Sequence, residues 1–317
     1  MSIERPPLVS IILVNYNGAA VVLNCLRSLQ QFNRSVATEI IVVDNASGDG
    51  SPDQIAQEFP QIALIRLSQN VGFGTGNNIG AQRARGEFLL LLNTDTLLIE
   101  DVLPELLRLM QAHPEAGIIG PRLLNADRTL QLSIAKEIGI KGEFQTLRQL
   151  QKARHSRHQE AVFAQYQSLQ AVDIVVGAAF LIRKTLFQRL GGFDQNFFMY
   201  FEESDLCQRA REAGWQILYS PTVSLIHLGG YSVGQRSQQM ALEYRRSQLY
   251  YYQKHRPLGE QIGLRIYLLL KFVLLWVKAG DRLALEVVPL LFNFRAYPLK
   301  VKRDGFTAAI VDSKEGG

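Results

Sequence analysis

Polar side chains follow two apolar runs in the first third of the chain, at the point where each run ends. Asp44-Asn45 comes after Ile40–Val43, and Asn93-Thr94-Asp95 comes after Phe88–Leu92. If these runs are strands of an open α/β sheet, both clusters lie at the carboxyl edge, where such sheets bind ligands. A carboxylate there can accept a hydrogen bond from a pyrimidine or ribose, or hold a hard cation that bridges phosphates. Capping or turn formation would explain one such cluster alone, but two at matched strand ends favour a nucleotide site.

A glycine- and asparagine-rich segment, Asn70–Gly80, leads into a predicted helix. Glycines let the backbone approach a ligand closely, and the start of a helix favours phosphate. The segment is not a dinucleotide fingerprint, because the third glycine would fall at Asn77 or Ile79 and because it follows the third strand rather than the first. No Gly-Lys-Ser/Thr sequence occurs, which also excludes a Walker A loop.

The segment Gly191–Cys207 surrounds three carboxylates, Glu202, Glu203 and Asp205, with aromatic residues. Aromatic rings offer a stacking surface for sugars, and carboxylates in an apolar wall have a raised proton affinity, as a general base requires. Acidic residues are also common at the start of a helix, which is the simpler explanation. His227 ends a later apolar run; taken alone, such a histidine is more often a core residue than a metal ligand.

The elements that must position these residues alternate between strands and helices. This alternation predicts βαβ units with a mostly parallel, Rossmann-like sheet flanked by helices. Residues 142–170 are polar and are predicted to form a mobile surface loop with some helix. Regular secondary structure is expected to resume at Val172–Arg183. The predicted strands are Leu8–Val14, Ile40–Val43, Ile62–Leu67, Phe88–Leu92, Gln216–Tyr219 and Val223–His227, and the predicted helices are Ala20–Leu29, one from Ser51, Asn78–Ala84 and Asp101–Ala112.

The chain after about Ser237 reads as helical. We therefore expect a catalytic α/β domain over residues 1–235 and a helical C-terminal extension over residues 236–317. Within the extension, Ile262–Val277 is apolar but contains Arg265 and Lys271, which count against a membrane span. Basic residues continue to Arg303, a pattern that fits helices lying on an anionic membrane surface. The alternative is a helical tail that packs on the domain or on a second subunit.

The bulk composition is that of an ordinary globular protein. The 317 residues are 47% hydrophobic and 20% charged, with a net charge of +5 that suits anionic partners of several kinds. Nucleic-acid binding has little support, because the sequence has no motif that combines basic and aromatic residues. Cys25 and Cys207 lie far apart in no metal-binding pattern, and the N-terminus has no signal-peptide pattern. These features predict a cytoplasmic location, with the extension at the inner face of the cell membrane; the oligomeric state cannot be read.

Five segments in this order resemble the family 2 glycosyltransferases, and the resemblance is closest to their bacterial rhamnosyltransferase-like branch. The resemblance covers roughly residues 8 to 230 and implies the GT-A fold and an inverting reaction. The segments that carry it are Val9–Asn17, Val42–Ser47, Asn70–Gly74, Leu92–Asp95 and Gly191–Cys207.

The resemblance also implies roles for individual residues. Asp44 would contact the pyrimidine base, and Asp95 would hold Mg²⁺ or Mn²⁺ together with His227. Asn93 departs from the Asp with which the family's Asp-x-Asp motif begins. Glu203 stands where the family has its catalytic Asp, with Asp205 as the second candidate, assigned to positioning or helix capping. The other candidates on the donor side are Asn15, Asn17, Asn45, Asn70, Gly72, Asn77 and Asn93.

The implied reaction moves a sugar, with rhamnose from dTDP-L-rhamnose as the first choice, to a hydroxyl of a glycan or a lipid-linked acceptor. A nucleotidyltransferase is the alternative enzyme, but it needs a basic, glycine-rich loop after the first strand, where this chain has Asn15-Tyr16-Asn17-Gly18. A non-catalytic nucleotide-sugar-binding or scaffold protein is the third interpretation, suggested by the departures at Asn93 and Glu203.

Overall fold

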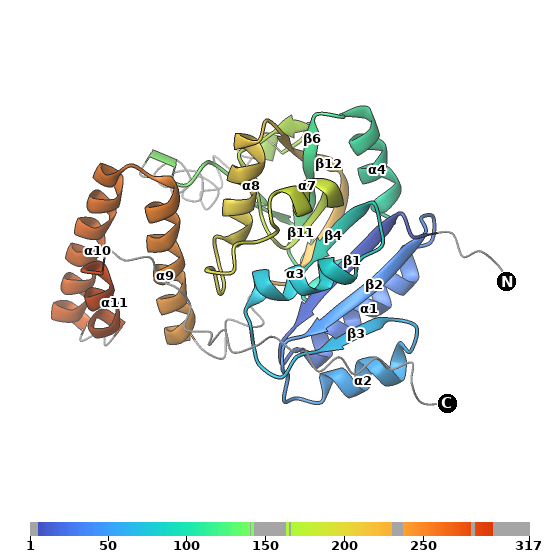
Figure 1. Ribbon diagram of the computed structural model, residues 1–317, viewed down its shortest axis with the longest axis horizontal. Coiled ribbons are helices and arrows are strands. Elements are labelled where there is room, and N and C mark those ends of the chain that lie inside the picture. Colours follow the sequence, from blue (N-terminus) through green and yellow to red (C-terminus); the bar gives the residue numbers. More distant parts are fainter. Residues whose placement is uncertain are drawn as a thin grey trace.

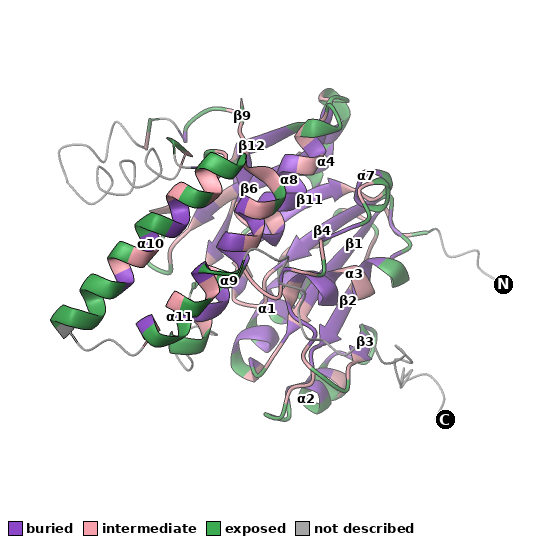
Figure 2. Cartoon of the chain, turned by 60° about the vertical axis from the view of Figure 1, so that its left-hand side comes forward, coloured by how far each residue is buried: buried purple, intermediate pink, exposed green. Residues whose placement is uncertain are grey.

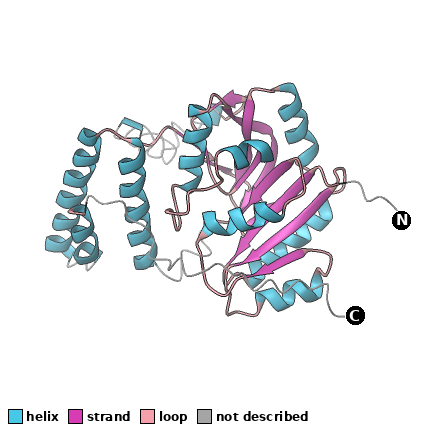
Figure 3. Cartoon of the chain, in the orientation of Figure 1, coloured by secondary structure: helices cyan, strands magenta, loops and turns pink. Residues whose placement is uncertain are grey.

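A computed structural model of the chain describes residues 6–139, 141–142, 163–164, 166–229, 237–279 and 283–293. Its centre is a mixed sheet with the strand order β3-β2-β1-β4-β11-β6-β12-β5, drawn in magenta between the helices in Figure 3. The four strands from β3 to β4 are parallel to one another, and β11 runs antiparallel to both of its neighbours. The bounds are β1 Val9–Asn15, β2 Thr38–Asp44, β3 Ala63–Arg66, β4 Phe88–Leu92, β5 Thr96–Leu98, β6 Ala116–Leu124, β11 Ala179–Arg183 and β12 Gln216–His227.

Helices cover both faces of this sheet (Figure 1). One core joins the sheet to α1, α2 and α4, and a second core on the other face joins it to α3, α7 and α8. Because both faces are buried, the strands are continuous apolar runs: in β1, Ile11 and Leu13 enter the first core while Ile12 enters the second. The helices are α1 Ala19–Phe32, α2 Ser51–Glu58, α3 Phe73–Arg83, α4 Leu103–Ala112, α7 Lys184–Arg189 and α8 Glu202–Glu212.

Three further helices, α9 (Ser237–His255), α10 (Leu258–Ala279) and α11 (Leu283–Leu291), form the C-terminal region on the left of Figure 1. They share a third core with two residues of the loop before α8, Phe197 and Phe201, so the helices pack on the α/β part. Among the described residues, no helix is both long and apolar enough to cross a membrane. The domain limits of 1–235 and 236–317 stay a prediction.

The predicted α/β class, with a mostly parallel central sheet and a helical C-terminal region, is confirmed. Two local predictions were wrong. Helix α3 begins at Phe73, five residues before the predicted Asn78, because Gly72 has φ 86 and turns the chain directly into the helix. Strand β6 was missed because Gly120 and Pro121 interrupt its apolar pattern. Gly120 is needed there, since a Cβ atom on it would lie 2.7 Å from the side chain of Val175.

Four short strands complete the described chain: β7 (Leu130–Gln131), β8 (Ile134–Ala135), β9 (Gln170–Ala171) and β10 (Ile174–Val175). β7 and β9 extend the large sheet, while β8 and β10 pair only with each other. The prediction of a mobile loop at 142–170 falls largely outside the described residues.

Candidate active site

A cavity of about 360 Å³ opens at the carboxyl ends of the parallel strands. The cavity is lined by six of the site residues that were predicted from the sequence. These six come from strand ends and from the turn before α3. The helical C-terminal region contributes two residues from the first turns of α9, which the sequence gave no reason to expect. The lining residues are Val14, Tyr16, Asn45, Asn70, Gly72, Phe73, Asn93, Thr94, Asp95, Phe198, Met199, Tyr200, His227, Gln239 and Met240.

The predicted residues Asn15 and Asp44 lie behind the cavity lining, at the ends of the paired strands β1 and β2. The Asn15 amide donates to the Asp44 carboxylate over 2.9 Å and to the Ser51 hydroxyl over 2.7 Å. The second carboxylate oxygen of Asp44 accepts from the backbone N–H of Ser47 at 3.0 Å. Only 2% of Asp44 is exposed, so this carboxylate shapes the loop after β2. Asn17 supports the same loop by accepting from the N–H of Gly48 at 2.8 Å.

Asn45 fastens that loop to the turn before α3. Its amide nitrogen donates to Asn70 over 2.8 Å and to the carbonyl of Gly72 over 3.2 Å, while its amide oxygen accepts from the N–H of Val71 at 2.8 Å. Gly72 is required at this point, because a Cβ atom on it would lie 2.4 Å from the carbonyl oxygen of Phe198. The structure therefore brings the two predicted donor-side segments into contact and closes them against the loop before α8.

Asn77 is the donor-side candidate whose place differs most from the expected one. Its amide donates to the carbonyl of Phe73 within α3 over 3.1 Å, and only 1% of the residue is exposed. It is absent from the cavity lining. In this structure the side chain supports the start of α3, and its role toward the donor stays a prediction.

The two predicted metal ligands lie together at one edge of the cavity. Nε2 of His227 is 3.3 Å from Oδ1 of Asp95, and both side chains are largely buried. Strands β5 and β12, which pair antiparallel with His227 opposite Thr96, hold them in place. Among the described residues no third His, Cys, Asp or Glu joins them. Such a pair suits Mg²⁺ or a similar ion that takes its other ligands from water and substrate phosphates.

The neighbours of His227 fix which ring nitrogen carries the proton. The amide nitrogen of Gln131 donates to Asn125 over 3.0 Å and to the carbonyl of His227 over 3.2 Å. Its amide oxygen must then face Nδ1 of His227, 2.7 Å away, and accept a proton from it. In the neutral ring Nε2 is left with a lone pair that faces the carboxylate of Asp95. Two acceptors at this distance require a positive charge between them, from a proton or a cation. The residues present therefore fit a metal ion.

Glu202 and Glu203 begin α8 directly after the cavity-lining loop. Burial raises the pKa of Glu202 well above its usual range, and the neighbouring charge of Glu203 raises it further. Burial also raises the pKa of Glu203, although backbone hydrogen bonds act against it. Glu202 is only 5% exposed, whereas Glu203 is partly exposed, so Glu203 is the more accessible carboxylate.

Glu203 lies near the Asp95 segment although it is not itself in the cavity lining. Its side chain packs over Gly177, where a Cβ atom would lie 3.3 Å from the Cβ of Glu203. The next residue, Ala178, accepts a hydrogen bond from the N–H of Asn93 at 2.8 Å. The two residues directly before β11 thus connect the predicted base to the predicted metal-binding segment.

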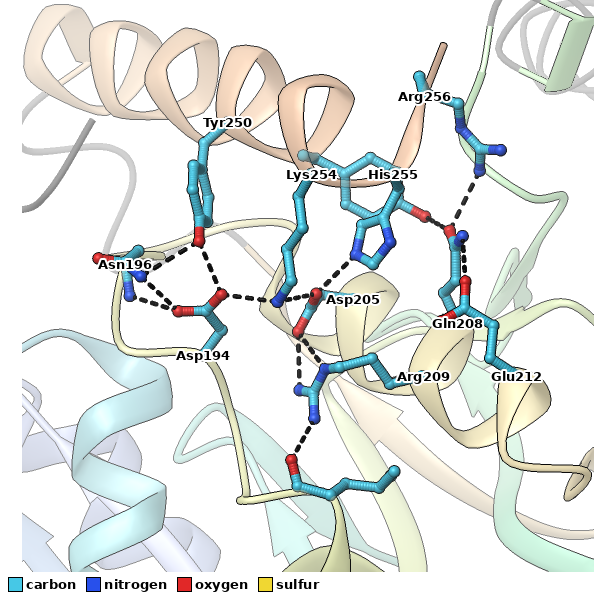
Figure 4. Close-up of polar contacts among 12 residues, drawn as sticks. Asp194, Asn196, Asp205, Gln208, Arg209, Glu212, Tyr250, Lys254, His255 and Arg256 are labelled. Carbon is cyan, nitrogen blue, oxygen red and sulfur yellow. Dashed lines mark hydrogen bonds and ion pairs between the residues drawn. The ribbon is translucent and has the colours of Figure 1, made fainter. Parts of the chain in front are cut away.

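Asp205 is absent from the cavity lining and lies in a cluster of cations, drawn in Figure 4. Its side chain is fully buried and ion-paired with Arg209 at 2.7 Å, Lys254 at 2.6 Å and His255 at 2.7 Å. Burial would raise the pKa of Asp205, but the hydrogen bond from His255 and the charges of Arg209 and Lys254 outweigh it and lower this pKa to about 2. We call these four residues the Asp205 cluster. It joins α8 to α9 and leaves Asp205 no free oxygen for a substrate proton.

Lys254 extends this connection to the loop before α8. Its ammonium group lies 2.6 Å from Asp194 as well as 2.6 Å from Asp205. Asp194 also accepts from the Tyr250 hydroxyl at 2.9 Å (Figure 4). None of the sequence motifs indicated Lys254 or His255, because their partners lie about fifty residues earlier and helix α9 has no pattern that marks them.

Two consecutive residues directly before α8 have a strained backbone. Tyr200 and Phe201 both have φ 70, a left-handed conformation that costs a side-chain-bearing residue about 1–3 kcal/mol. Contacts with Tyr244 of α9, at ring distances of 5.5 and 5.1 Å, hold both residues in place. Packing against α9 thus maintains the bend that delivers Glu202 and Glu203 to the site.

Comparison with known proteins supports the resemblance seen in the sequence. Residues 10–191, more than half of the chain, match the family model described as glycosyl transferase family 2. The N-acetylglucosaminyl-diphospho-decaprenol L-rhamnosyltransferase of Mycobacterium tuberculosis is 27% identical over 224 residues, which are 63% of this chain and 71% of that protein. Rhamnosyltransferase WbbL of Escherichia coli is 27% identical over 182 residues, 55% of this chain and 67% of that protein.

Solved glycosyltransferase structures share the fold. Mannosyltransferase PcManGT of Pyrobaculum calidifontis, in complex with GDP-Man and Mn²⁺, matches 83% of this chain with a TM-score of 0.53 and 19% identity. GalNAc-T7, with UDP, GalNAc and Mn²⁺, matches 78% with a TM-score of 0.54 and 15% identity. This chain spans 65% and 50% of the length of those two chains. With this fold, the cavity at the strand ends and the match over residues 10–191, the chain belongs to glycosyl transferase family 2.

Proposed function

We propose that this chain transfers a sugar from a nucleoside diphosphate to a hydroxyl group of a glycan or lipid-linked acceptor, with inversion and with the help of a divalent cation. The observation that carries the proposal is the Asp95–His227 pair, whose facing acceptor atoms call for a positive charge at the edge of the cavity. The named rhamnosyltransferases among the relatives support dTDP-L-rhamnose as the first donor to test. The decaprenol-linked sugar in one of those names supports a lipid-linked acceptor.

Asp95 and His227 would hold the cation, Mg²⁺ or Mn²⁺, and the Mn²⁺ complexes of the two solved neighbours support this assignment. When bound, the ion offsets the charge that develops on the leaving diphosphate. Gln131 accepts the Nδ1 proton of His227, so that in the neutral ring Nε2 carries the lone pair that a metal ligand needs. Asn45, Asn70 and Gly72 form the wall on which the nucleotide is expected to lie.

Glu203 would act as the general base. It accepts the proton of the acceptor hydroxyl, whose oxygen then attacks the anomeric carbon in line with the departing diphosphate. A single displacement of this kind inverts the anomeric centre. The raised pKa of Glu203 makes it a better proton acceptor than an ordinary surface carboxylate, and its position beside the Asn93 segment supports the role.

A screen of nucleotide sugars, with Mg²⁺ and with Mn²⁺, tests the proposal by measuring released nucleoside diphosphate. We expect one donor to release its nucleoside diphosphate, and to do so faster when an acceptor is present. Chelation of the metal should stop this release. Glu203→Gln should bind the same donor without turnover and so serves as the control for contaminating activity. Donor binding without turnover in the native chain would favour a nucleotide-sugar-binding protein. Release of pyrophosphate from a nucleoside triphosphate would instead indicate a nucleotidyltransferase.

A further inference from the structure

Helix α10 presents an apolar face to solvent. Nine large hydrophobic residues of this helix are exposed between its second turn and its end, among them Ile266 at 54%, Leu270 at 60% and Val277 at 70%. A folded domain rarely leaves so many large apolar side chains together in water, so an exposed patch of this kind marks a binding surface. The nine are Ile262, Ile266, Tyr267, Leu270, Val273, Leu274, Leu275, Trp276 and Val277.

The periodicity of the helix separates this face from the buried one. Leu264, Leu268 and Phe272, spaced by four residues, turn inward and pack in the core that α10 shares with α9 and α11. Ile262, Ile266 and Leu270 have the same spacing and turn outward. The outward stripe runs about 22 Å, at about 1.5 Å per residue over the fifteen steps from Ile262 to Val277. Figure 2 shows α10 as a long, mainly exposed helix at the edge of the molecule.

The charge of the sequence that contains and follows this face indicates what covers it. From Lys271 to Arg303 the sequence has seven basic residues and two acidic ones. Lys278 follows the stripe at the end of α10 and is exposed, whereas Lys271 lies within the length of the stripe and is half-buried beside Phe272. Long side chains of this kind can lie along an apolar surface and keep their charge in water. Trp276 and Tyr267 are the residue types that favour the boundary between lipid and water. A second copy of this chain would bring the same excess of positive charge to the contact.

We infer that the outward face of α10, defined by Ile262, Ile266, Leu270, Val273 and Val277, docks on an anionic lipid bilayer with the helix lying in the plane of the surface. No described helix is long and apolar enough to cross the membrane, in keeping with a helix that lies on it. This docking rests on the proposed function, to which it adds the place where the enzyme would meet a lipid-linked acceptor. Helix α10 packs on α9, whose first turns line the cavity, so docking would bring the site near a lipid-linked acceptor.

Co-sedimentation of the full chain with vesicles tests the inference. The vesicles are phosphatidylcholine alone or mixed with phosphatidylglycerol, at low and at high salt. We expect binding to the mixed vesicles, weakened by salt because part of the attraction is electrostatic. The double variant Ile266→Asp/Leu270→Asp should lose roughly tenfold or more of this binding. The control Gln57→Asp/Gln111→Asp adds the same two charges at exposed positions of α2 and α4 and should bind almost as the native chain does.

Release of nucleoside diphosphate by the same proteins, without vesicles, separates this inference from the proposed function. Both double variants should release it as the native chain does, because neither changes the cavity. Two results would overturn the inference: native chain that ignores mixed vesicles, or an α10 double variant that binds them unchanged. If the native chain is a dimer in sedimentation velocity and the α10 double variant is a monomer, the outward face of α10 is an interface between two copies of the chain. That result would also overturn the inference of membrane docking. Vesicle binding by a chain that consumes no donor would refute the proposed function alone.

Discussion

Replacing Asp205 by asparagine should remove a large part of the stability of the α8–α9 contact. The carboxylate is fully buried and contacts Arg209, Lys254 and His255 within 2.7 Å. Asparagine keeps the shape but not the charge, so three cationic or cation-forming groups would face one another around a neutral amide. Removing one partner of a buried ion pair typically costs about 3–5 kcal/mol.

The pKa of Asp205 gives an independent figure for the same interaction. It falls from 3.8 to about 2 in the folded chain. At about 1.36 kcal/mol per unit, this difference corresponds to roughly 2–3 kcal/mol of stability. The two figures overlap near about 3 kcal/mol, and in a domain of this size each kcal/mol lowers the melting temperature by roughly 2–4 °C. We therefore expect Asp205→Asn to melt roughly 6–12 °C below the native chain.

The sign of the pH dependence follows from the lowered pKa. A carboxyl group with a depressed folded-state pKa stabilises fully above its unfolded pKa, here 3.8, and this contribution is lost as the pH falls towards about 2. The native chain should lose roughly 2–3 kcal/mol from Asp205 across this window, and Asp205→Asn should not show that loss.

Thermal melting followed by circular dichroism at pH 7 measures the first effect, and urea unfolding at pH 7 and at steps from pH 5 to pH 2 measures the second. Asp53→Asn is the control, since it removes the same charge from an exposed ion pair with Arg66 that should be worth less than about 1 kcal/mol. If Asp205→Asn unfolds at the native urea concentration and keeps the acid-induced loss, the Asp205 cluster does not stabilise the chain. If it stays stable but cannot turn over the donor, Asp205 is the base and the assignment to Glu203 is wrong.

Four further substitutions test the site itself. Glu203→Gln should lower kcat about 10²–10⁴-fold with donor binding retained. We expect kcat/KM of the native enzyme to decline as the pH falls below the raised pKa of Glu203, and this decline should be absent in the variant. Normal turnover by the variant would exclude Glu203 as the base. Asp95→Ala should eliminate metal-dependent turnover without unfolding the chain, and unchanged activity with unchanged metal dependence would contradict the assignment. Asp44→Ala should weaken nucleoside diphosphate binding in calorimetry, because it releases the loop after β2 as well as any contact to the base; native affinity would argue against both roles. Gly72→Ala should destabilise the chain and weaken donor binding, since its Cβ atom would meet the Phe198 carbonyl at 2.4 Å, and native-like melting would show that the turn can adjust.

Much of the part of the chain that is expected to bind the donor could be predicted, because the sequence patterns that mark its strands are local. Buried parallel strands are continuous apolar runs, and the polar residues that end them, such as Asp44 and Asn93, identify the edge of the sheet that holds the cavity. The pair of Asp95 and His227 came from the resemblance, and the structure brings the two side chains together from positions 132 residues apart.

The contributions of tertiary packing could not be predicted. Asp205 lies in an acidic segment close to Glu203, and only the position of α9 shows that its carboxylate pairs with Lys254 and His255. The apolar pattern of α10 indicated a surface helix, but which residues face outward depends on its contacts with α9 and α11. Gln239 and Met240 reach the cavity through the same packing, with no motif around them.

The first turns of α9 close one wall of the cavity, yet they lie outside residues 10–191, the segment that matches the family. The part of the chain that defines the family therefore does not define the whole shape of its cavity. A change in the first turns of α9 would therefore reshape the opening of the cavity without any change in residues 10–191. For protein engineering, an exchange confined to α9 would leave Glu203 and His227 in place, provided that the new helix keeps Lys254 and His255, which pair with Asp205.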